Sequence, residues 1–535
     1  MSQAKATDEA DLTPPRDAEI GARQRIAGST HGMVSAAHYE ATRAGREILE
    51  AGGNAVDAAV AAAFALGVCE PAASGLGGQT MMLVHLAESH RTLALDGSSR
   101  APNRATVESV SRRQRRRGYR AATVPSTPAV LAHALRHYGT FKFRQVLQPA
   151  IRLAEDGYRV TTLQHQLARR EAKKLKLGTG DALFLRNGRA YPAGATHRQP
   201  VLAETLQRLA KHGVQDFYTG ELARLIEEDM IRNDGLIRLD DLAQIPRPIE
   251  RRPLSCRFDS ARVLTFPPPG AGRTLVEMVN AYQHLSDRLR DPDTPQGALA
   301  LAEVIRQAFV DRDDRPFDPN YYAQVSKKQM LSLAYAKTVA RRVTESVAGS
   351  GETTHLSVMD HSGNAVALTQ SIETVYGSGC ATPSLGFLYN NYLSAFEYED
   401  HSHPYYLRPN AVPWASVAPT IVFRGRKPWL TIGSPGSERI TSSILQVLIR
   451  LMRQTPLAAV EAPRLHCSLS GKVSIEAERV ADDILEALET HGFDVDHREG
   501  FSFYLGCVQL VLRDRKGFVG VADTRRDGAA AGPRR

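Results

Sequence analysis

Hydrophobic positions in the first two thirds of the chain recur mainly at the spacing of α-helices. Over residues 38–68 the pattern predicts two helices separated by a Gly-Gly pair, and Asn54 is placed to cap the second helix. Further along, Leu202, Leu206 and Leu209 stand at i, i+4 and i+7, the spacing of one buried helix face. Between these regions, a glycine-rich turn leads into the apolar run "MMLVHL", which predicts a buried strand.

Beyond Thr354 the pattern changes to short apolar runs separated by turns. It predicts successive strands as far as Val422, followed by both helices and strands almost to the C-terminus. Residues 1–30 and the tail from Arg525 are rich in polar or small residues, and both are predicted to be disordered. Residues 341–352 carry no apolar periodicity and are predicted to form an exposed linker.

Residues 354–371 fit a single β-hairpin. A three-residue loop ending in Gly363 would need a left-handed residue at its end, which glycine supplies without strain. Carrying the register outward from this loop places Thr353 opposite Ser371, with their Cβ atoms about 5 Å apart. The sequence therefore predicts two hydroxyl side chains together at the open end of the hairpin.

Composition identifies a large globular protein. The chain has 535 residues, of which 42% are hydrophobic and 23% are charged, enough for a large α/β enzyme or for two or three modules. The net charge of +9 (67 − 58) is concentrated in part at residues 111–120, "SRRQRRRGYR". We interpret this run as a solvated surface segment, because no aromatic ladder or nucleic-acid motif accompanies it. A nucleic-acid partner is therefore not expected.

Several features favour a cytoplasmic location. The polar N-terminus lacks the apolar core of a secretory signal, and the longest apolar run, residues 59–69, is too short to span a bilayer. The five cysteines form no C-x-x-C pair and are odd in number, as is typical of reduced thiols. We expect no membrane association, no disulfide framework, no metal and no cofactor.

The paired threonines at 353 and 354 raise the question of a nucleophile. A threonine hydroxyl is a poor nucleophile unless a base accepts its proton. That base could be a histidine, a lysine, or the α-amine of the threonine itself if the chain were cut just before it. A free α-amine titrates at about 7.7–8.0, so it serves as a base near neutral pH. The predicted linker upstream would be open to such a cut, but an ordinary edge strand is the alternative interpretation.

A second candidate is the turn "GSPGS" at residues 433–437, which connects a predicted strand to a predicted helix. Free backbone N–H groups at such a turn can hold an anion or a developing oxyanion. It is not a phosphate-binding P-loop, because the G-x-x-x-x-G-K-[ST] spacing is absent. A plain strand–helix turn remains the alternative.

Ordered sequence blocks extend from about Gly32 to Val521, and together they resemble the γ-glutamyltransferase (γ-glutamyltranspeptidase) family of N-terminal nucleophile (Ntn) hydrolases. The blocks that carry the resemblance are "GGNAVDAAVAAAFALGVCEPAASGLGG", "TVPSTPAVLAHALRHYGT", "LQPAIRLAEDGYRV", "FPPPGAGRTLVEMVNAY", "LAEVIRQAFVDRDDRPFDPNY", "TTHLSVMDHSGNAVALTQSIETVYGSG" and "APTIVFRGRKPWLTIGSPGSERI". The sixth block is similar to the most specific motif of the family.

The resemblance implies an α/β fold, a four-layer αββα sandwich built from two fragments of a self-cleaved precursor. The precursor would be cut between Glu352 and Thr353. Residues 1–30 would be a disordered lead-in, and residues 31–352 would form the large subunit. Residues 353–535 would form the small subunit. The expected assembly is a heterodimer of these fragments, and a larger oligomer is left open.

The resemblance also implies catalytic roles. Thr353 would be the nucleophile and, through its new α-amine, the base. Ser371 stands at the position of a family threonine whose hydroxyl bonds the nucleophile, in agreement with the hairpin register. The backbone N–H groups of Gly436 and Ser437 match the oxyanion hole, where the family usually has two glycines.

The positions that would hold a glutamyl head group depart from the family. Substrate-binding candidates here are Arg100, Glu373, Tyr392 and Ser416. In the family an arginine clamps the α-carboxylate of a γ-glutamyl substrate, and Ser98 stands at the position of that arginine. Ala395 and Ala415 also replace polar residues of the family. Loss of a bidentate arginine–carboxylate pair removes both geometry and charge. A glutamate at 373 would in addition oppose a substrate carboxylate.

Three hypotheses of function follow. The first is a γ-glutamyl hydrolase or transferase with an altered pocket. The second is hydrolysis of a different amide, such as oxamate, a cephalosporin side chain or a natural-product intermediate. In both, a small-molecule amide donates its acyl group to water or an amine. The third is an unprocessed homologue that only binds a partner.

Overall fold

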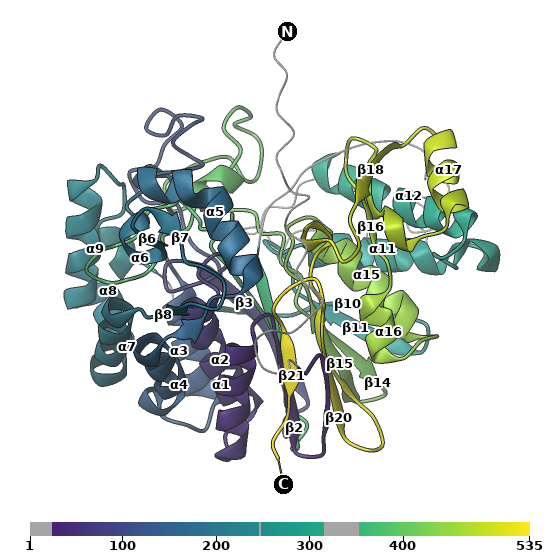
Figure 1. The fold of residues 1–535 in the computed structure, drawn as a ribbon, viewed down its shortest axis with the longest axis horizontal. Helices are drawn as coiled ribbons and strands as arrows, with labels where there is room; N and C mark the ends of the chain where they lie inside the picture. The colour runs from purple at the N-terminus through teal and green to yellow at the C-terminus, as the bar shows by residue number, and fades with distance from the viewer. Residues whose placement is uncertain (1–23, 246–247, 315–352, 535) are drawn as a thin grey trace.

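The computed structural model describes residues 24–245, 248–314 and 353–534. Two seven-stranded sheets lie face to face in the middle of the molecule, and helices cover the outer face of each (Figure 1). The four-layer αββα sandwich predicted from the sequence is thus confirmed.

The first sheet contains the predicted hairpin at its centre. Its strands follow the order β21-β2-β12-β13-β3-β4-β9, and all neighbours are antiparallel. Their bounds are β2 (Gly32–Ala36), β3 (Gln79–Leu86), β4 (Arg91–Gly97), β9 (Ile249–Arg251), β12 (Thr354–Asp360), β13 (Ala365–Ser371) and β21 (Ala529–Ala531).

The second sheet contains β15, the strand that ends at the predicted strand–helix turn. Its strands follow the order β1-β20-β19-β15-β14-β11-β10, again antiparallel throughout. Their bounds are β1 (Ile26–Ser29), β10 (Leu254–Phe258), β11 (Ala261–Thr265), β14 (Thr420–Arg424), β15 (Lys427–Gly433), β19 (Gln509–Arg513) and β20 (Phe518–Ala522).

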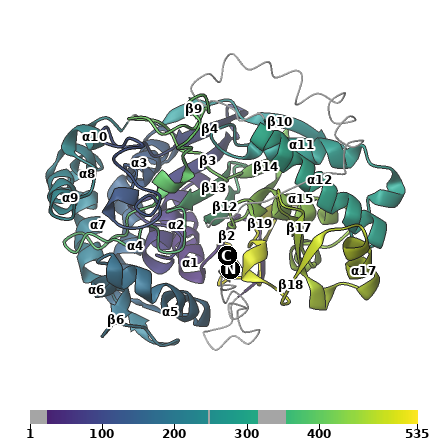
Figure 2. The ribbon, with the colours of Figure 1, turned by 90° about the horizontal axis from the view of Figure 1, so that it is seen from above.

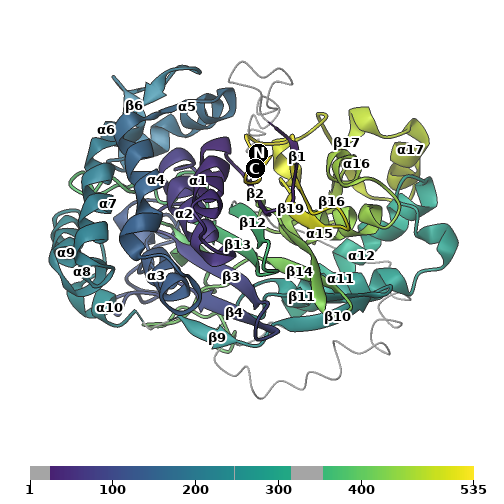
Figure 3. The same ribbon diagram turned by 90° about the horizontal axis from the view of Figure 1, so that it is seen from below.

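Two groups of helices form the outer layers, one on each side of the paired sheets (Figures 2 and 3). The first sheet is covered by α1 (Tyr39–Glu50), α2 (Ala55–Cys69), α3 (Thr127–Tyr138) and α4 (Phe143–Asp156), with α5 (Thr162–Leu177), α6 (Asp181–Phe184), α7 (Pro200–His212), α8 (Gln215–Thr219), α9 (Glu221–Arg232) and α10 (Leu239–Ala243) further out. The second sheet is covered by α11 (Gly272–Gln283), α12 (Pro295–Asp314), α15 (Arg439–Leu451), α16 (Pro456–Glu461) and α17 (Asp482–Thr490).

Small sheets complete the two outer layers. They pair β16 (Leu465–Cys467) with β17 (Lys472–Glu476) and β18 (Asp494–Arg498), β5 (Tyr158–Arg159) with β8 (Thr196–His197), and β6 (Leu185–Arg186) with β7 (Arg189–Ala190). No helix within the described residues has the length and apolar character needed to cross a membrane.

Apolar side chains fill the space between the two sheets. Met33, Met81 and Met359 of the first sheet belong to the same buried cluster as Ile421 and Val511 of the second. Alternate residues on each strand point into this layer, as the two-residue period of a strand requires. The strands that carry both candidate catalytic segments are therefore held on a packed apolar layer.

Helices α2 and α7 form as the sequence predicts. The Asn54 side chain accepts hydrogen bonds from the N–H groups of Val56 and Asp57, while the Asp57 carboxylate accepts from the N–H of Asn54, which completes a capping box. Leu202 and Leu206 of α7 are buried in the helical layer, as the i, i+4 spacing indicates.

Two segments near the chain ends form strands, contrary to the prediction. Residues Ile26–Ser29 form strand β1, which pairs with β20, so the lead-in 1–30 is wrong for its last residues, and residues 1–23 lie outside the described part. Residues Ala529–Ala531 form β21, which pairs with β2. These short strands have too few apolar residues to be seen as strands in the sequence, and their partners in the sheets supply the hydrogen bonds that order them.

The predicted run of strands between Thr354 and Val422 is also wrong in its middle part. Between Ser371 and Thr420 the chain forms loops, isolated bridges and one short 3₁₀ turn, Tyr392–Ala395. Many of these loop residues are nevertheless buried against the helical layer and the first sheet. The loops therefore form the wall of a site rather than part of a sheet.

Candidate active site

The hairpin register derived from the sequence is confirmed. Strand β12 pairs with β13 so that Thr354 lies opposite Gln370 and His355 opposite Thr369, and Gly363 in the loop has a φ of +94°. Extending this register by one residue places Thr353 opposite Ser371. The Thr353 Oγ1 donates a hydrogen bond to the Ser371 Oγ at 3.5 Å, and both residues are almost completely buried.

Ser371 is held in place from its other side. The backbone N–H of Glu373 donates to the Ser371 Oγ at 2.8 Å, which closes a tight turn at the end of β13. The hydroxyl of Tyr392 interacts with the side chains of Ser371 and Glu373. Burial raises the pKa of Tyr392 above its usual value, so its hydroxyl stays protonated near neutral pH. Ser371 therefore has a fixed position beside Thr353.

Glu373 occupies an unusual position for a carboxylic acid. Its backbone has a φ of +78°, a conformation that residues with a Cβ rarely adopt. Burial raises the pKa of its carboxyl group to about 7, although a hydrogen bond from Tyr392 opposes the shift. Strain and a perturbed carboxyl group together are typical of functional sites.

The 433–437 turn forms where it was predicted. Strand β15 ends at Gly433 and α15 begins at Arg439, with Gly436 at a φ of +116° and Ser437 at +53°. The Ser434 Oγ accepts from the N–H of Cys507 at 2.9 Å, which fixes the turn against the loop that precedes β19. Within the described residues, no protein acceptor faces the N–H groups of Gly436 and Ser437. They are available to an oxyanion, as the sequence suggested.

A cavity of about 310 Å³ adjoins this turn. Of the residues predicted from the sequence, Glu373, Ala395, Ser416 and Ser437 line it, and the Ser416 and Ser437 hydroxyls are 3.5 Å apart. Thr353 and Ser371 do not line it. The remaining wall includes three aromatic side chains and several charged ones: Phe396, Tyr405, Trp414, Arg273, Arg312, Asp313, Glu397 and Glu438.

The charge of the cavity is dominated by acids. Arg312 is paired with Glu438 at 2.5 Å, and the Arg273 guanidinium donates to the backbone oxygen of Asp311 at 2.9 Å. Glu438 offsets the charge of Arg312, whereas the charge of Arg273 is outnumbered by Asp313, Glu397 and, in its ionised form, Glu373 on the same wall. A substrate carboxylate would meet net repulsion here.

Arg100 is not brought to this cavity. Its guanidinium donates to the backbone oxygen of Asn410 at 3.0 Å, and burial lowers its pKa. The Ser98 hydroxyl bonds Asp96 at 2.5 Å, and Asp96 is paired with Arg251 at 2.7 Å. The structure therefore places the two candidate replacements for the clamping arginine outside the cavity wall.

His355 is not the base that the nucleophile needs. Its two ring nitrogens are hydrogen-bonded to the hydroxyls of Thr369, at 2.8 Å, and Ser357, at 3.2 Å. Burial lowers its pKa to about 3, so the ring is neutral and structural. His355 is therefore removed from the bases considered from the sequence, and the α-amine of Thr353 stays a prediction. The predicted junction at Glu352 lies outside the described residues.

Two residues near Thr353 were missed by sequence reasoning. The Thr354 hydroxyl donates to the Glu70 carboxylate at 2.5 Å, and the Arg526 guanidinium donates to the backbone oxygen of Thr353 at 3.3 Å. Arg526 lay in the tail that was predicted to be disordered. Nothing in the local pattern marks either residue, because their roles depend on contacts with distant segments.

Comparison with known proteins identifies the family. A family model described as "Gamma-glutamyltranspeptidase" matches residues 41–533. The chain belongs to the γ-glutamyltranspeptidase family. It is 31% identical over 531 residues to the glutathione hydrolase proenzyme of Escherichia coli, covering 92% of this chain and 90% of that protein. It is also 31% identical over 516 residues to the acylase ACY 1 proenzyme of a Pseudomonas species, covering 91% of each.

Solved structures of γ-glutamyltranspeptidase relatives agree with this assignment. The cephalosporin acylase of Bacillus halodurans superposes with a TM-score of 0.88 at 28% identity, covering 97% of this chain and 99% of that one. The γ-glutamyltranspeptidase of Helicobacter pylori, at 32% identity, covers 57% of this chain and 90% of that one with a TM-score of 0.54. The protein is therefore an enzyme of the Ntn-hydrolase superfamily.

Proposed function

We propose that the protein is a self-cleaved amidohydrolase or acyltransferase whose nucleophile is the N-terminal threonine of its small subunit. The observation that carries the proposal is the buried Thr353–Ser371 hydroxyl pair at 3.5 Å, which is bonded through Ser371 to Glu373 at the wall of a cavity that Ser437 also lines. The names of two relatives as proenzymes support processing of the chain, and we propose that the cut lies before Thr353.

The chemistry needs only groups of this chain and the substrate. The α-amine of Thr353 takes the proton from its own Oγ1, and the oxygen attacks the substrate carbonyl. The N–H groups of Gly436 and Ser437 stabilise the oxyanion that forms. The C–N bond then breaks, the leaving amine takes the proton, and an ester to Thr353 remains. Water or an amine attacks this ester and regenerates the free hydroxyl.

The first test is cleavage itself. The purified protein is expected to contain fragments of 352 and 183 (535 − 352) residues, the shorter one starting at Thr353. Thr353→Ala should remain a single chain, because it lacks the hydroxyl that attacks the preceding peptide bond. Gel electrophoresis and N-terminal sequencing measure this outcome. A parent protein that stays full length would contradict the proposal and favour a binding homologue.

We further propose that the acyl group lacks the carboxylate of a γ-glutamyl substrate. Acids outnumber arginines at the cavity wall, Arg312 is paired with Glu438, and Arg100 lies elsewhere. Charged groups left without a partner in a buried site cost about 1.5–3 kcal/mol or more. A γ-glutamyl head group would therefore bind poorly, whereas a neutral or amino-bearing chain would not face this penalty.

Four p-nitroanilides test this proposal, because they vary the two charges of the head group independently. They are γ-glutamyl, glutaryl (carboxylate only), 4-aminobutyryl (amine only) and butyryl (neither). We expect kcat/KM to be at least about tenfold lower for the member of each pair that carries the carboxylate. Blanks without enzyme correct for cyclisation of the amino-bearing compounds. A preference for γ-glutamyl or glutaryl anilide would contradict the altered pocket and leave the amidase proposal standing.

A further inference from the structure

Arg526 reaches the nucleophile from the opposite end of the chain. Its guanidinium donates to the backbone oxygen of Thr353 at 3.3 Å, and its Cζ lies 4.3 Å from the centre of the Phe503 ring. The side chain is 2% exposed and sits 3.7 Å from the Glu70 carboxylate. An arginine in such a dry position is costly unless it is paired, so its placement beside Thr353 requires a compensating interaction.

Glu70 supplies that interaction and adds a second contact to the same strand. One of its carboxylate oxygens faces Arg526, and the other accepts the hydroxyl of Thr354 at 2.5 Å. The two consecutive threonines are thus held by one ion pair, Thr353 through its backbone and Thr354 through its side chain. Thr354 points to the helical side of the sheet, where Glu70 follows the end of α2.

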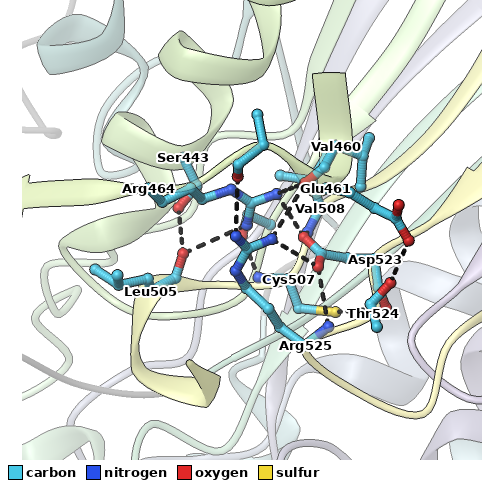
Figure 4. Close-up of polar contacts among 12 residues, drawn as sticks. Ser443, Val460, Glu461, Arg464, Leu505, Cys507, Val508, Asp523, Thr524 and Arg525 are labelled. Atoms are coloured by element: carbon cyan, nitrogen blue, oxygen red, sulfur yellow. Dashed lines mark hydrogen bonds and ion pairs between the residues drawn. The ribbon is translucent and has the colours of Figure 1, made fainter. Parts of the chain in front are cut away.

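A buried ionic network fixes the segment that carries Arg526. Asp523 is paired with Arg464 at 2.5 Å and with Arg525 at 3.1 Å, and its carboxylate also accepts from the N–H of Val508 at 2.8 Å (Figure 4). Burial alone raises the pKa of Asp523, but the two guanidinium groups outweigh it and hold the pKa below its usual value. The network therefore holds Asp523 and Arg525 in their charged forms, and it anchors residues 523–525 next to Cys507.

We propose that Arg526 and Glu70 form a positioning pair that fixes the start of strand β12, and that the positive charge of Arg526 favours the neutral, proton-accepting form of the Thr353 α-amine. This inference rests on the proposed function, because it concerns the amine that cleavage creates. It assigns to Arg526 an electrostatic role that does not require contact with the substrate.

The sign of the effect follows from geometry. The amine nitrogen and the carbonyl oxygen of one residue are only about 3 Å apart, so the guanidinium lies within about 6 Å of the amine. A positive charge at that distance disfavours the protonated amine and lowers its pKa, whereas a carboxylate has the opposite effect. Removing Arg526 should therefore raise the amine pKa, and removing the charge of Glu70 should lower it.

Other charged groups surround this pair and must be accounted for. They are Glu373 beyond Ser371, Asp527 bonded to the Thr161 hydroxyl, Arg25 bonded to the backbone oxygen of Arg526, and the Asp523, Arg464 and Arg525 network. Of these, the carboxyl of Glu373 has a pKa of about 7 and titrates in the range of the amine. Profiles are therefore also compared in a Glu373→Gln background, where that carboxyl is absent.

The test compares Arg526→Gln, Arg526→Lys and Glu70→Gln with the parent, using butyryl p-nitroanilide. We expect all variants to keep their fold. Arg526→Gln should lower kcat several-fold with little change in KM and move the acid limb of the kcat/KM profile to higher pH. Arg526→Lys should restore most of both, because it keeps the charge. Glu70→Gln should move the same limb to lower pH.

The acid limb of the kcat/KM profile should move in opposite directions in Arg526→Gln and Glu70→Gln. A merely structural role would lower activity in both variants without these opposite shifts. Arg450→Gln is the matched control, because Arg450 is also buried and paired, with Asp293 at 2.6 Å, but lies on α15 away from Thr353. A folded, uncleaved Arg526→Gln protein would support positioning at the junction. Parental kcat and an unmoved limb in Arg526→Gln would overturn the inference.

Two outcomes remain distinct from these. Melting and circular dichroism show whether Arg526→Gln keeps its fold. If it does not, Arg526→Lys and Glu70→Gln decide the question. An unmoved acid limb of the kcat/KM profile in both overturns the inference, and an acid limb at lower pH in Glu70→Gln supports it. If the parent itself is neither cleaved nor active, the proposed function fails. A cleaved and active parent with insensitive variants removes only the role of Arg526 and Glu70.

Discussion

At the scale of single residues, the site depends on hydroxyl groups held at fixed positions. Ser371 receives the Thr353 hydroxyl and is itself fixed by the N–H of Glu373 and the hydroxyl of Tyr392. A threonine stands at this position in the family that the sequence resembles, and serine keeps the oxygen while losing only a methyl group. The hydroxyl is thus the feature that the site retains.

Ser371→Ala should slow maturation or turnover. Loss of one positioned hydrogen bond costs about 0.5–1.5 kcal/mol, which corresponds to a rate reduction of about two- to tenfold. The rate of fragment appearance and kcat on an anilide measure the two steps separately. Ser371→Thr should retain both, because it keeps the oxygen at the same place. Unchanged rates in Ser371→Ala would show that the hydroxyl pair does not contribute.

At the scale of secondary-structure elements, the proposed chemistry requires that the connection from β15 to α15 leave the N–H groups of Gly436 and Ser437 open to the substrate. Gly436 has a φ of +116°, and a Cβ built on it would come within 3.1 Å of the Cα of Gly506. Any larger residue there would have both backbone strain and a close contact with the loop that precedes β19. Ser437 follows at a φ of +53°, a milder left-handed conformation that a serine tolerates at some cost.

Gly436→Ala should therefore disturb the turn and reduce kcat by about 10²–10³-fold, the effect of losing one oxyanion donor. Gly425→Ala is the matched control, because Gly425 lies at the other end of β15 with a φ of +62° and open space around its Cα. The control should cost some stability while keeping kcat. Equal kcat values in parent and Gly436→Ala would argue against an oxyanion role for this turn.

At the scale of the whole molecule, neutral histidines are buried in two places. His85 and His355 lie between the two sheets, and His197 lies in the helical layer. Burial lowers the pKa of His355 to about 3 and those of His85 and His197 to about 4. His355 packs against Gly433 of the facing sheet, so it joins the hairpin to the strand that ends at the 433–437 turn. These rings stay unprotonated in the folded protein at pH values where the unfolded chain already binds protons.

The protein should consequently lose stability as the pH falls below about 6.5. Between the unfolded pKa of about 6.5 and the folded pKa of about 3, the unfolded state binds the proton of His355 first, which favours unfolding by up to about 5 kcal/mol. His355→Gln should reduce the decrease in melting temperature between pH 7 and pH 4. The measurement is made in Thr353→Ala, which stays one chain, with the exposed His361→Gln as control. Identical pH dependence in both variants would contradict this explanation.

The sequence predicted much of the fold, but not the middle of the second half. Helix α2 follows from an apolar run with Asn54 before it, and α7 from the spacing of its leucines. In contrast, the region between Ser371 and Thr420 has the apolar content of strands but forms buried loops. Burial explains the composition of that region, and composition alone does not distinguish a buried loop from a strand.

What the sequence determined by itself was local. The pairing of Thr353 with Ser371 follows from a short loop and the two-residue period of strands, and the 433–437 turn follows from its glycines. Only the tertiary structure decided which distant groups surround them. The contact between Arg526 and Thr353 joins residues 173 positions apart, and Arg100 is turned away from the cavity by Asn410. Such contacts depend on how strands and layers bring separate segments together, and this information is not contained in the spacing of neighbouring residues.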